Sequence, residues 1–173
     1  MAKNSSIKNN NSNYEHIEPH SITNTPDIPE TSSFTSSTTF FTDTPVDTIA
    51  NGECIPFQTQ LINTGLDVIK SEYYDTDFIL VHPGIYQVFV RINVEPNTFP
   101  MQIVLLLTNA IHDIVEQIWG SLTLIPASGG IMTSMCIFKN ENAYSMLRVQ
   151  NISSISFCIS DRNDSQLIIT RLG

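Results

Sequence analysis

The clearest hydrophobic pattern lies between residues 84 and 94. Every second residue from Tyr86 to Val94 is apolar and the residues between them are mainly polar, with Phe89 as an apolar exception. Alternation with a period of two residues predicts a half-buried β-strand. His82-Pro83-Gly84 comes directly before it and predicts a turn, because proline fixes φ and glycine tolerates positive φ.

Short apolar segments separated by turn residues fill the rest of the chain after residue 53. We expect further strands at residues 57–62, 78–81, 101–108, 113–119, 131–138, 144–149, 153–159 and 167–172. No helical period interrupts them. Eight to ten short antiparallel strands at spacings of about 8–12 residues predict an all-β fold, a sandwich of the jelly-roll type.

Composition divides the chain near residue 53. Of residues 1–50, 23 are Ser, Thr or Asn, whereas long apolar runs begin only after Cys54. Such a polar stretch cannot bury enough apolar surface to offset the entropy lost on ordering. We therefore predict a disordered tail or connector arm at residues 1–53 and a jelly-roll domain at residues 54–173.

Charge is scarce throughout the sequence. Only 14% of residues are charged and the net charge is −9, whereas about 25% is usual in soluble domains. Without a basic patch to neutralise phosphates, we do not expect a nucleic-acid partner. We expect no membrane span, because no apolar run reaches about 18–20 residues. The N-terminal residues show no apolar segment of a Sec signal peptide.

Residues 101–107 form a strand pattern that is apolar on both faces. Such a strand is buried on both sides, either inside the monomer or against a neighbouring subunit. The sequence pattern alone leaves both alternatives open.

Two segments resemble a known family. Residues 78–88, Phe-Ile-Leu-Val-His-Pro-Gly-Ile-Tyr-Gln-Val, resemble the F-x-V-x-x-x-G-x-Y-x-V/I signature of the complement-head and tumour-necrosis-factor-like jelly rolls. Residues 166–172, Gln-Leu-Ile-Ile-Thr-Arg-Leu, resemble the last strand of the bacterial branch. That branch includes the C-terminal domain of BclA-type exosporium glycoproteins and exosporium basal-layer proteins. Unlike BclA-type chains, this one has no Gly-X-Y collagen repeats, which favours a basal-layer or appendage role.

The resemblance implies a homotrimer with a structural role on the spore surface, in the exosporium or an appendage. Its three-fold axis would supply the neighbour for the doubly apolar strand, so the implied trimer interface is Met101, Ile103, Leu105 and Leu107. The expected partners are further copies of the chain and other spore-surface proteins.

Candidate chemistry is sparse in the sequence. No catalytic motif is present, so we expect no enzyme activity, and we expect no cofactor. His16 and His20 are four residues apart, but Pro19 opposes a helix there and no further ligand completes a metal site. Cys54 lies at the predicted junction of tail and domain, where it is either a thiol that links two chains through a disulfide or an ordinary exposed thiol.

Three phenylalanines interrupt the polar tail: Phe34, Phe40 and Phe41. Because Thr and Phe favour strands, residues 34–42 are either an arm that pairs with a neighbouring domain by strand addition or a plain tether with incidental aromatic residues.

These observations favour a non-enzymatic structural protein that self-assembles as jelly-roll trimers in a spore surface layer or surface fibre, with the N-terminal arm linking particles. The alternative is a ligand- or receptor-binding jelly-roll head. Such a head would carry clustered aromatic or acidic residues in its loops, for which Tyr73-Tyr74-Asp75 is a candidate.

Overall fold

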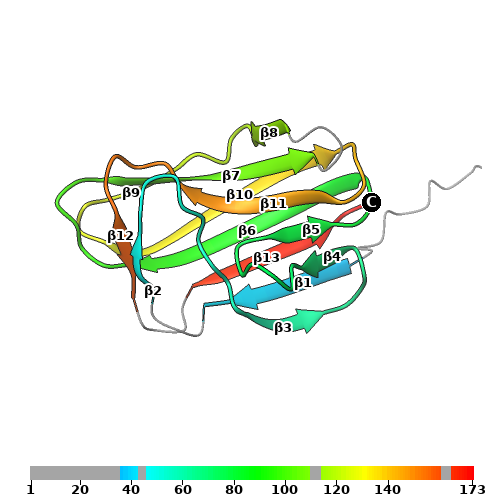
Figure 1. Cartoon of the computed structure of the whole chain (residues 1–173), viewed down its shortest axis with the longest axis horizontal. Coiled ribbons are helices and arrows are strands. Elements are labelled where there is room, and N and C mark those ends of the chain that lie inside the picture. Colours follow the sequence, from blue (N-terminus) through cyan, green and yellow to red (C-terminus); the bar gives the residue numbers. More distant parts are fainter. Residues whose placement is uncertain (1–35, 43–45, 110–113, 161–164) are drawn as a thin grey trace, which may run out of the picture.

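Two antiparallel β-sheets pack face to face in the computed structural model, which describes residues 36–42, 46–109, 114–160 and 165–173 (Figure 1). These described residues contain thirteen strands and no helix. The sequence-based expectation of an all-β jelly-roll sandwich is confirmed. The sequence predicted eight to ten strands, fewer than the thirteen described, because several short strands lie in segments without a clear alternation of apolar and polar residues.

Sheet A contains seven of the described strands. In spatial order, five of them are β3 (Thr59–Asn63), β1 (Ser36–Phe41), β13 (Gln166–Arg171), β6 (Gly84–Val94) and β10 (Gly130–Asn140). The other two are β12 (Phe157–Ile159), which pairs with the Val94 end of β6, and β2 (Val46–Ile49), which pairs with β12.

Sheet B contains the six remaining strands. Their order is β4 (Val68–Lys70), β5 (Phe78–Leu80), β11 (Ser145–Asn151) and β7 (Met101–Asn109), with β8 (Ile114–Gln117) and β9 (Thr123–Ile125) both on the far edge of β7. In Figure 1, β8 lies along the upper border of the molecule and β3 along the lower border.

The long strand β6 organises sheet A. It pairs with β10 over its whole length and with β13 on its other side. The alternating apolar residues from Tyr86 to Val94 are all buried, whereas Phe89 and the polar residues between them remain half-buried on the outward face. The period-two pattern therefore correctly predicted which face of β6 forms the core.

Gly84 is the first residue of β6, and the chain is crowded there. Its φ is 157°, and a Cβ at this position would lie 2.7 Å from the carbonyl oxygen of Gly173. That same oxygen accepts a hydrogen bond from the backbone N–H of Ile85 at 2.8 Å. Two residues further on, the hydroxyl of Tyr86 donates to the carbonyl oxygen of His82 at 2.7 Å. The G-x-Y motif thus closes the turn around the end of the last strand.

The folded part begins earlier than the composition of the chain indicated. Strand β1 lies between β13 and β3, and Phe40 is fully buried, with its ring centroid 4.6 Å from that of Phe78 in the opposite sheet. The predicted boundary at residue 53 therefore needs correction, since β1 and β2 belong to sheet A. The average composition of residues 1–50 concealed a six-residue strand in which Ser and Thr, both compatible with a sheet, surround one core aromatic.

Candidate functional site

The predicted trimer interface lies largely inside the monomer. Met101, Ile103 and Leu105 are at most 3% exposed and belong to the hydrophobic core between the two sheets, while Leu107 packs against that core. Of the two alternatives for this strand, the structure supports burial within the chain, so Met101, Ile103 and Leu105 do not form an intersubunit surface. Leu107 is half-buried, and its place in a trimer interface stays a prediction. The opposite face of β7 is covered in part as well, since Val104 is only 1% exposed.

The predicted connector residues have different environments. Phe40 is in the core of its own chain, Phe41 is half-buried at the end of β1, and Phe34 lies outside the described residues. Strand β1 does join a sheet, as the strand-addition hypothesis requires, but the sheet belongs to the same chain. Phe40 is therefore not a free anchor for a neighbouring subunit.

None of the three cysteines forms a disulfide in the structure. Cys54 is half-buried and forms an isolated β-bridge with Gln150. Burial raises the pKa of the Cys54 thiol, and the nearby Arg148 guanidinium offsets this only in part. The intermolecular disulfide of Cys54 stays a prediction. Cys136 is buried, an environment in which a cysteine acts as a small apolar residue, and Cys158 is half-buried.

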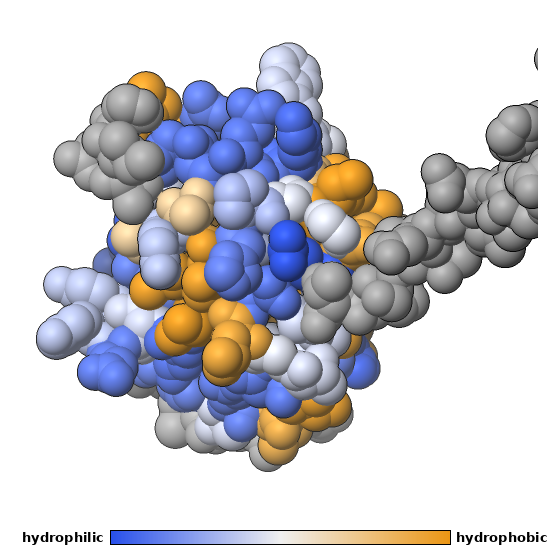
Figure 2. Space-filling view, turned by 90° about the vertical axis from the view of Figure 1, so that its right-hand side faces the viewer, coloured by the Kyte–Doolittle hydropathy of each residue, from blue (hydrophilic) through white to orange (hydrophobic). Residues whose placement is uncertain are grey.

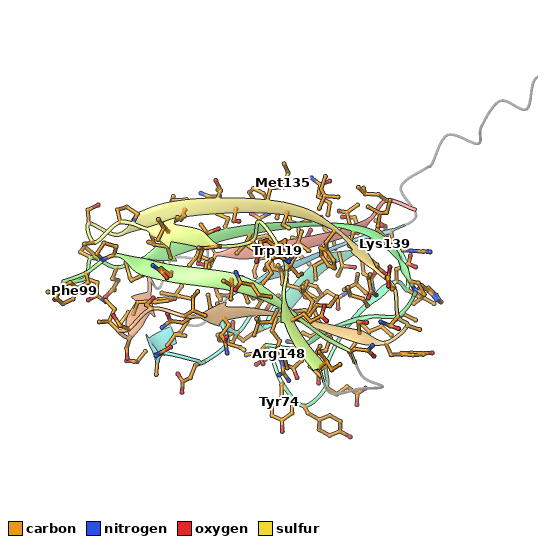
Figure 3. The ribbon with its side chains drawn as sticks, turned by 90° about the horizontal axis from the view of Figure 1, so that it is seen from above. Tyr74, Phe99, Trp119, Met135, Lys139 and Arg148 are labelled. Carbon is orange, nitrogen blue, oxygen red and sulfur yellow. The ribbon has the colours of Figure 1, made fainter. Side chains whose placement is uncertain are left out.

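An apolar row crosses the outward face of sheet A. Residues directly opposite each other on antiparallel strands share a face, and the strand register aligns Met135, Phe89, Ile168, Thr39 and Ile62 across β10, β6, β13, β1 and β3. We call this set row A. Met135 and Ile62 at its two ends are 60% and 53% exposed. Figure 3 shows Met135 pointing outward from β10, away from sheet B.

The strands that carry row A lack acidic residues. None of β3, β1, β13, β6 and β10 contains Asp or Glu, although the whole chain has 17. Ile131 and Ile137, 55% and 57% exposed, add further apolar surface along β10. The charged residues on these strands are all basic: Arg91, Lys139 and Arg171. Exposed apolar side chains gathered on one face are typical of a protein–protein contact.

A second apolar surface lies on the edge of the sandwich beside β10. Trp119 is 95% exposed, and Leu122 and Leu124 are 51% and 59% exposed. Trp119 also lines a shallow hollow between β8 and β10, together with Leu107 and Ile137. In Figure 3 it lies between the two layers, on the edge that faces the viewer. Seen from the end of the sandwich, apolar side chains form separate patches within a largely polar surface (Figure 2).

The loop between β4 and β5 presents two aromatic side chains. Tyr73 and Tyr74 are 87% and 65% exposed at its tip. Arg148 fixes the base of the loop through two hydrogen bonds to the buried carboxylate of Asp77, both 2.7 Å, and Lys70 forms an ion pair with Asp75 at 2.6 Å. Burial favours the neutral acid, but the hydrogen bonds from Arg148 and Thr76 outweigh it and hold the pKa of Asp77 below its ordinary value.

Neither a metal-ligand cluster nor a membrane-spanning helix is found among the described residues. Within the described residues, no three His, Cys, Asp or Glu side chains are grouped as a metal site would require. The same part of the chain forms no helix long and apolar enough to cross a membrane. His16 and His20 lie outside the described residues.

Sequence reasoning missed the surfaces on sheet A and on the edge beside it. The one available signal was Phe89, an apolar residue on the otherwise polar side of an alternating strand. Its significance depends on Met135, Ile168 and Ile62, which are distant in sequence and come together only through the register of five strands.

The fold is a β-sandwich of the jelly-roll type, and the solved structures that it resembles include tumour-necrosis-factor-like proteins. The chain is similar to the crystal structure of murine APRIL at pH 8.5, with a TM-score of 0.63, 14% identity, and coverage of 79% of this chain and 98% of that one. It is also similar to the Eiger TNF from S. frugiperda, with a TM-score of 0.65, 13% identity, and coverage of 81% and 93%. No protein-family model matches the sequence, and no curated protein matches it. At these identities the likeness concerns the fold alone.

Proposed function

We propose that this protein is a non-enzymatic structural subunit that self-assembles as a homotrimer in a spore surface layer or a surface fibre. The observation that carries the proposal is the outward face of sheet A, where row A crosses five strands that contain no acidic residue. In a chain with a net charge of −9, copies repel one another over most of their surface. The outward face of sheet A is one where contact meets little electrostatic opposition.

The exposed apolar surface on the edge beside β10 is the surface that would bind the outward face of sheet A of a neighbouring copy. Trp119 and Leu122 are exposed on a surface different from row A. When two different surfaces of one chain bind each other, the contact is heterologous and closes into a ring if the rotation between copies allows it. The number three comes from the resemblance of residues 78–88 to the trimeric jelly-roll family.

The spore-surface location rests on the sequence alone. It is supported by the resemblance of residues 166–172 to the closing strand of the exosporium branch. The scarcity of charged residues suits a protein that packs into a layer with its own copies and with other spore-surface proteins.

Light scattering of the purified full-length chain and of Met135→Lys tests the trimer. We expect the unmodified chain to have three times the monomer mass of 19.3 kDa. The charged variant should be monomeric with an unchanged circular-dichroism spectrum, because Met135 is 60% exposed and outside the core. Thr98→Lys, which places the same charge on an exposed loop residue, should remain trimeric. A monomeric unmodified chain, or a trimeric Met135→Lys, contradicts the proposal.

The alternative function is a ligand- or receptor-binding head, and the fixed loop with Tyr73 and Tyr74 favours it. Aromatic side chains on a preorganised loop bind with little loss of conformational entropy. A panel of immobilised oligosaccharides is a suitable probe. Binding that is lost in Tyr73→Ala/Tyr74→Ala while the trimer mass is kept would support a ligand-binding head in place of a purely structural subunit.

A further inference from the structure

Arg91 differs from the other basic residues of the described part of the chain. Four of the five lysines and arginines there form ion pairs: Lys70 with Asp75, Lys139 with Glu141, Arg148 with Asp77 and Arg171 with Asp67. Arg91 forms none with any residue that the structure describes, although the chain has 17 acidic and only 8 basic residues. A basic side chain without an acidic partner is therefore unusual in this chain.

Arg91 lies on the outward face of sheet A, beside row A. It comes two residues after Phe89 on β6, so the two side chains share a face. Its neighbours across the sheet are Thr133 on β10 and Gln166 on β13, neither of which is charged. The Arg91 side chain is half-buried. The outward face of sheet A therefore presents an unpaired, partly desolvated positive charge next to its apolar residues.

The edge beside β10 carries a charge of the opposite sign. Glu116 on β8 is exposed and lines the same hollow as Trp119. Lys139 lines this hollow too, but its ammonium group is paired with Glu141 at 3.1 Å. Within the described ranges, Glu116 forms no ion pair. The two surfaces that meet in the proposed trimer thus carry complementary unpaired charges.

We infer that Arg91 of one copy forms an ion pair with Glu116 of the neighbouring copy. The inference rests on the proposed trimer, in which the outward face of sheet A binds the edge beside β10. Glu116 comes three residues before Trp119, so packing of Trp119 against row A brings its carboxylate toward Arg91. A guanidinium binds a carboxylate through two parallel hydrogen bonds and holds it in one orientation.

Charge complementarity identifies the partner as a second copy. Copies with a net charge of −9 repel one another in general, so a stable contact between them needs a place where opposite charges meet. The face with Arg91 and the edge with Glu116 provide that place, and each copy has both. An acidic protein of another kind would occupy only the face with Arg91 and leave Glu116 without a partner.

The ion pair also selects a ring over a two-fold dimer. Two copies of sheet A stacked face to face would enclose two Arg91 side chains and no acidic residue of the strands that carry row A, because these strands contain none. A contact that leaves charges of one sign without partners is disfavoured. Binding of the face to the edge of the next copy pairs every Arg91 and is heterologous, as a ring requires.

The experiment measures the concentration at which trimers of the full-length chain dissociate, by sedimentation equilibrium. Arg91→Glu and Glu116→Arg should each raise this concentration about tenfold or more, because each places like charges against each other. The exchanged variant Arg91→Glu/Glu116→Arg restores opposite charges. Its dissociation concentration should return to within about threefold of that of the unmodified chain, as expected for two residues in direct contact.

The matched control is Arg91→Glu/Glu72→Arg, which has the same net charge as the exchanged variant. Glu72 is exposed in the loop after β4, and β4 and β8 lie at opposite edges of sheet B. The control variant should dissociate like Arg91→Glu alone. Recovery in the control equal to that in the exchanged variant would show an effect of net charge and overturn the pairing with Glu116.

A neutral set of variants keeps the test decisive if charge reversal at the half-buried Arg91 prevents folding. Arg91→Gln introduces a side chain that this face already carries at Gln87 and Gln166, so the circular-dichroism spectrum should be unchanged. A pair that is already broken cannot be lost twice. Arg91→Gln/Glu116→Gln should therefore dissociate no more readily than either single variant. Additive weakening in the double variant overturns the ion pair.

The outcomes separate the ion pair from the proposed trimer. A trimer that Arg91→Glu leaves unaffected, or that the exchanged variant fails to restore, overturns the ion pair and leaves the trimer intact. An unmodified chain that stays monomeric at every concentration overturns both. Recovery in the exchanged variant, and not in the variant with Glu72→Arg, supports both.

Discussion

Arg148 on β11 and Asp77, directly before β5, are 71 residues apart along the chain and are joined by two hydrogen bonds of 2.7 Å from the guanidinium to both carboxylate oxygens. The carboxylate is almost completely buried and the guanidinium is partly exposed. Because a buried carboxylate needs its partner, this pair fixes the base of the loop that carries Tyr73 and Tyr74.

The ion pair makes stability depend on pH. Asp77 has a lowered pKa in the folded chain, so its contribution to stability is present above the pKa of the unfolded state and is lost as the pH falls through the lower, folded value. Arg148→Met should cost about 1.5–3 kcal/mol at neutral pH, the usual range for charge-assisted hydrogen bonds. Urea unfolding between pH 7 and pH 3 provides the measurement. A difference between variant and unmodified protein that fails to shrink in acid would show that the pair is not the source of the effect.

Phe40 should be essential for folding although it lies in a Ser/Thr-rich segment. Phe40→Ala should cost about 3–5 kcal/mol, as is usual for a buried aromatic residue, whereas Phe41→Ala next to it should cost much less because Phe41 is half-buried. Thermal unfolding of the two variants gives the comparison. Equal melting temperatures would mean that β1 contributes no core.

Truncations should locate the start of the folded part. Removing residues 1–35 should leave the melting temperature almost unchanged, since that segment is rich in Ser, Thr and Asn and has little apolar surface to bury. Removing residues 1–53 should destabilise the protein severely, because it deletes β1 and β2 and leaves β13 and β3 without their shared neighbour. Calorimetry on the two truncated chains distinguishes a boundary at residue 36 from one at residue 53.

Gly84 should tolerate no side chain. A Cβ there would lie 2.7 Å from a backbone oxygen, which cannot move aside as a flexible side chain can. Gly84→Ala should therefore be more destabilising than Gly120→Ala, whose Cβ would meet no atom within 4 Å and whose cost is limited to its φ of 78°, about 1–2 kcal/mol. The denaturant midpoints of the two variants, measured under the same conditions, show which substitution lowers the free energy of unfolding more.

Cys54 should react slowly, because burial raises the pKa of its thiol and keeps it protonated at neutral pH. If it does join chains, oxidised protein will show a dimer band on non-reducing gels that disappears in Cys54→Ser and persists in Cys136→Ser. Bands of monomer size for all three proteins would leave Cys54 as an ordinary thiol.

Features that depend on residues close together in the sequence could be predicted, whereas features that depend on the pairing of distant strands could not. The alternation around Val90 and the turn at Gly84 are local, and both identified β6 correctly. The strand at Met101 to Leu107 was also found, but its apolar residues on both faces could not show which protein surface covers each side. Row A could not be predicted, because residues such as Met135 and Ile168 become neighbours only through strand pairing.

The pairing of Ser36 with Arg171 brings the first described residue of the chain beside the end of the last strand. In a ring, rotation about a single axis relates all copies. If Ser36 and Arg171 lie toward one end of that axis in one copy, they lie toward the same end in every copy. A cyclic particle built this way has polarity: one side carries all the entry points of the polypeptide, and the opposite side carries none. A layer made of such particles would have an inner and an outer surface of different chemistry.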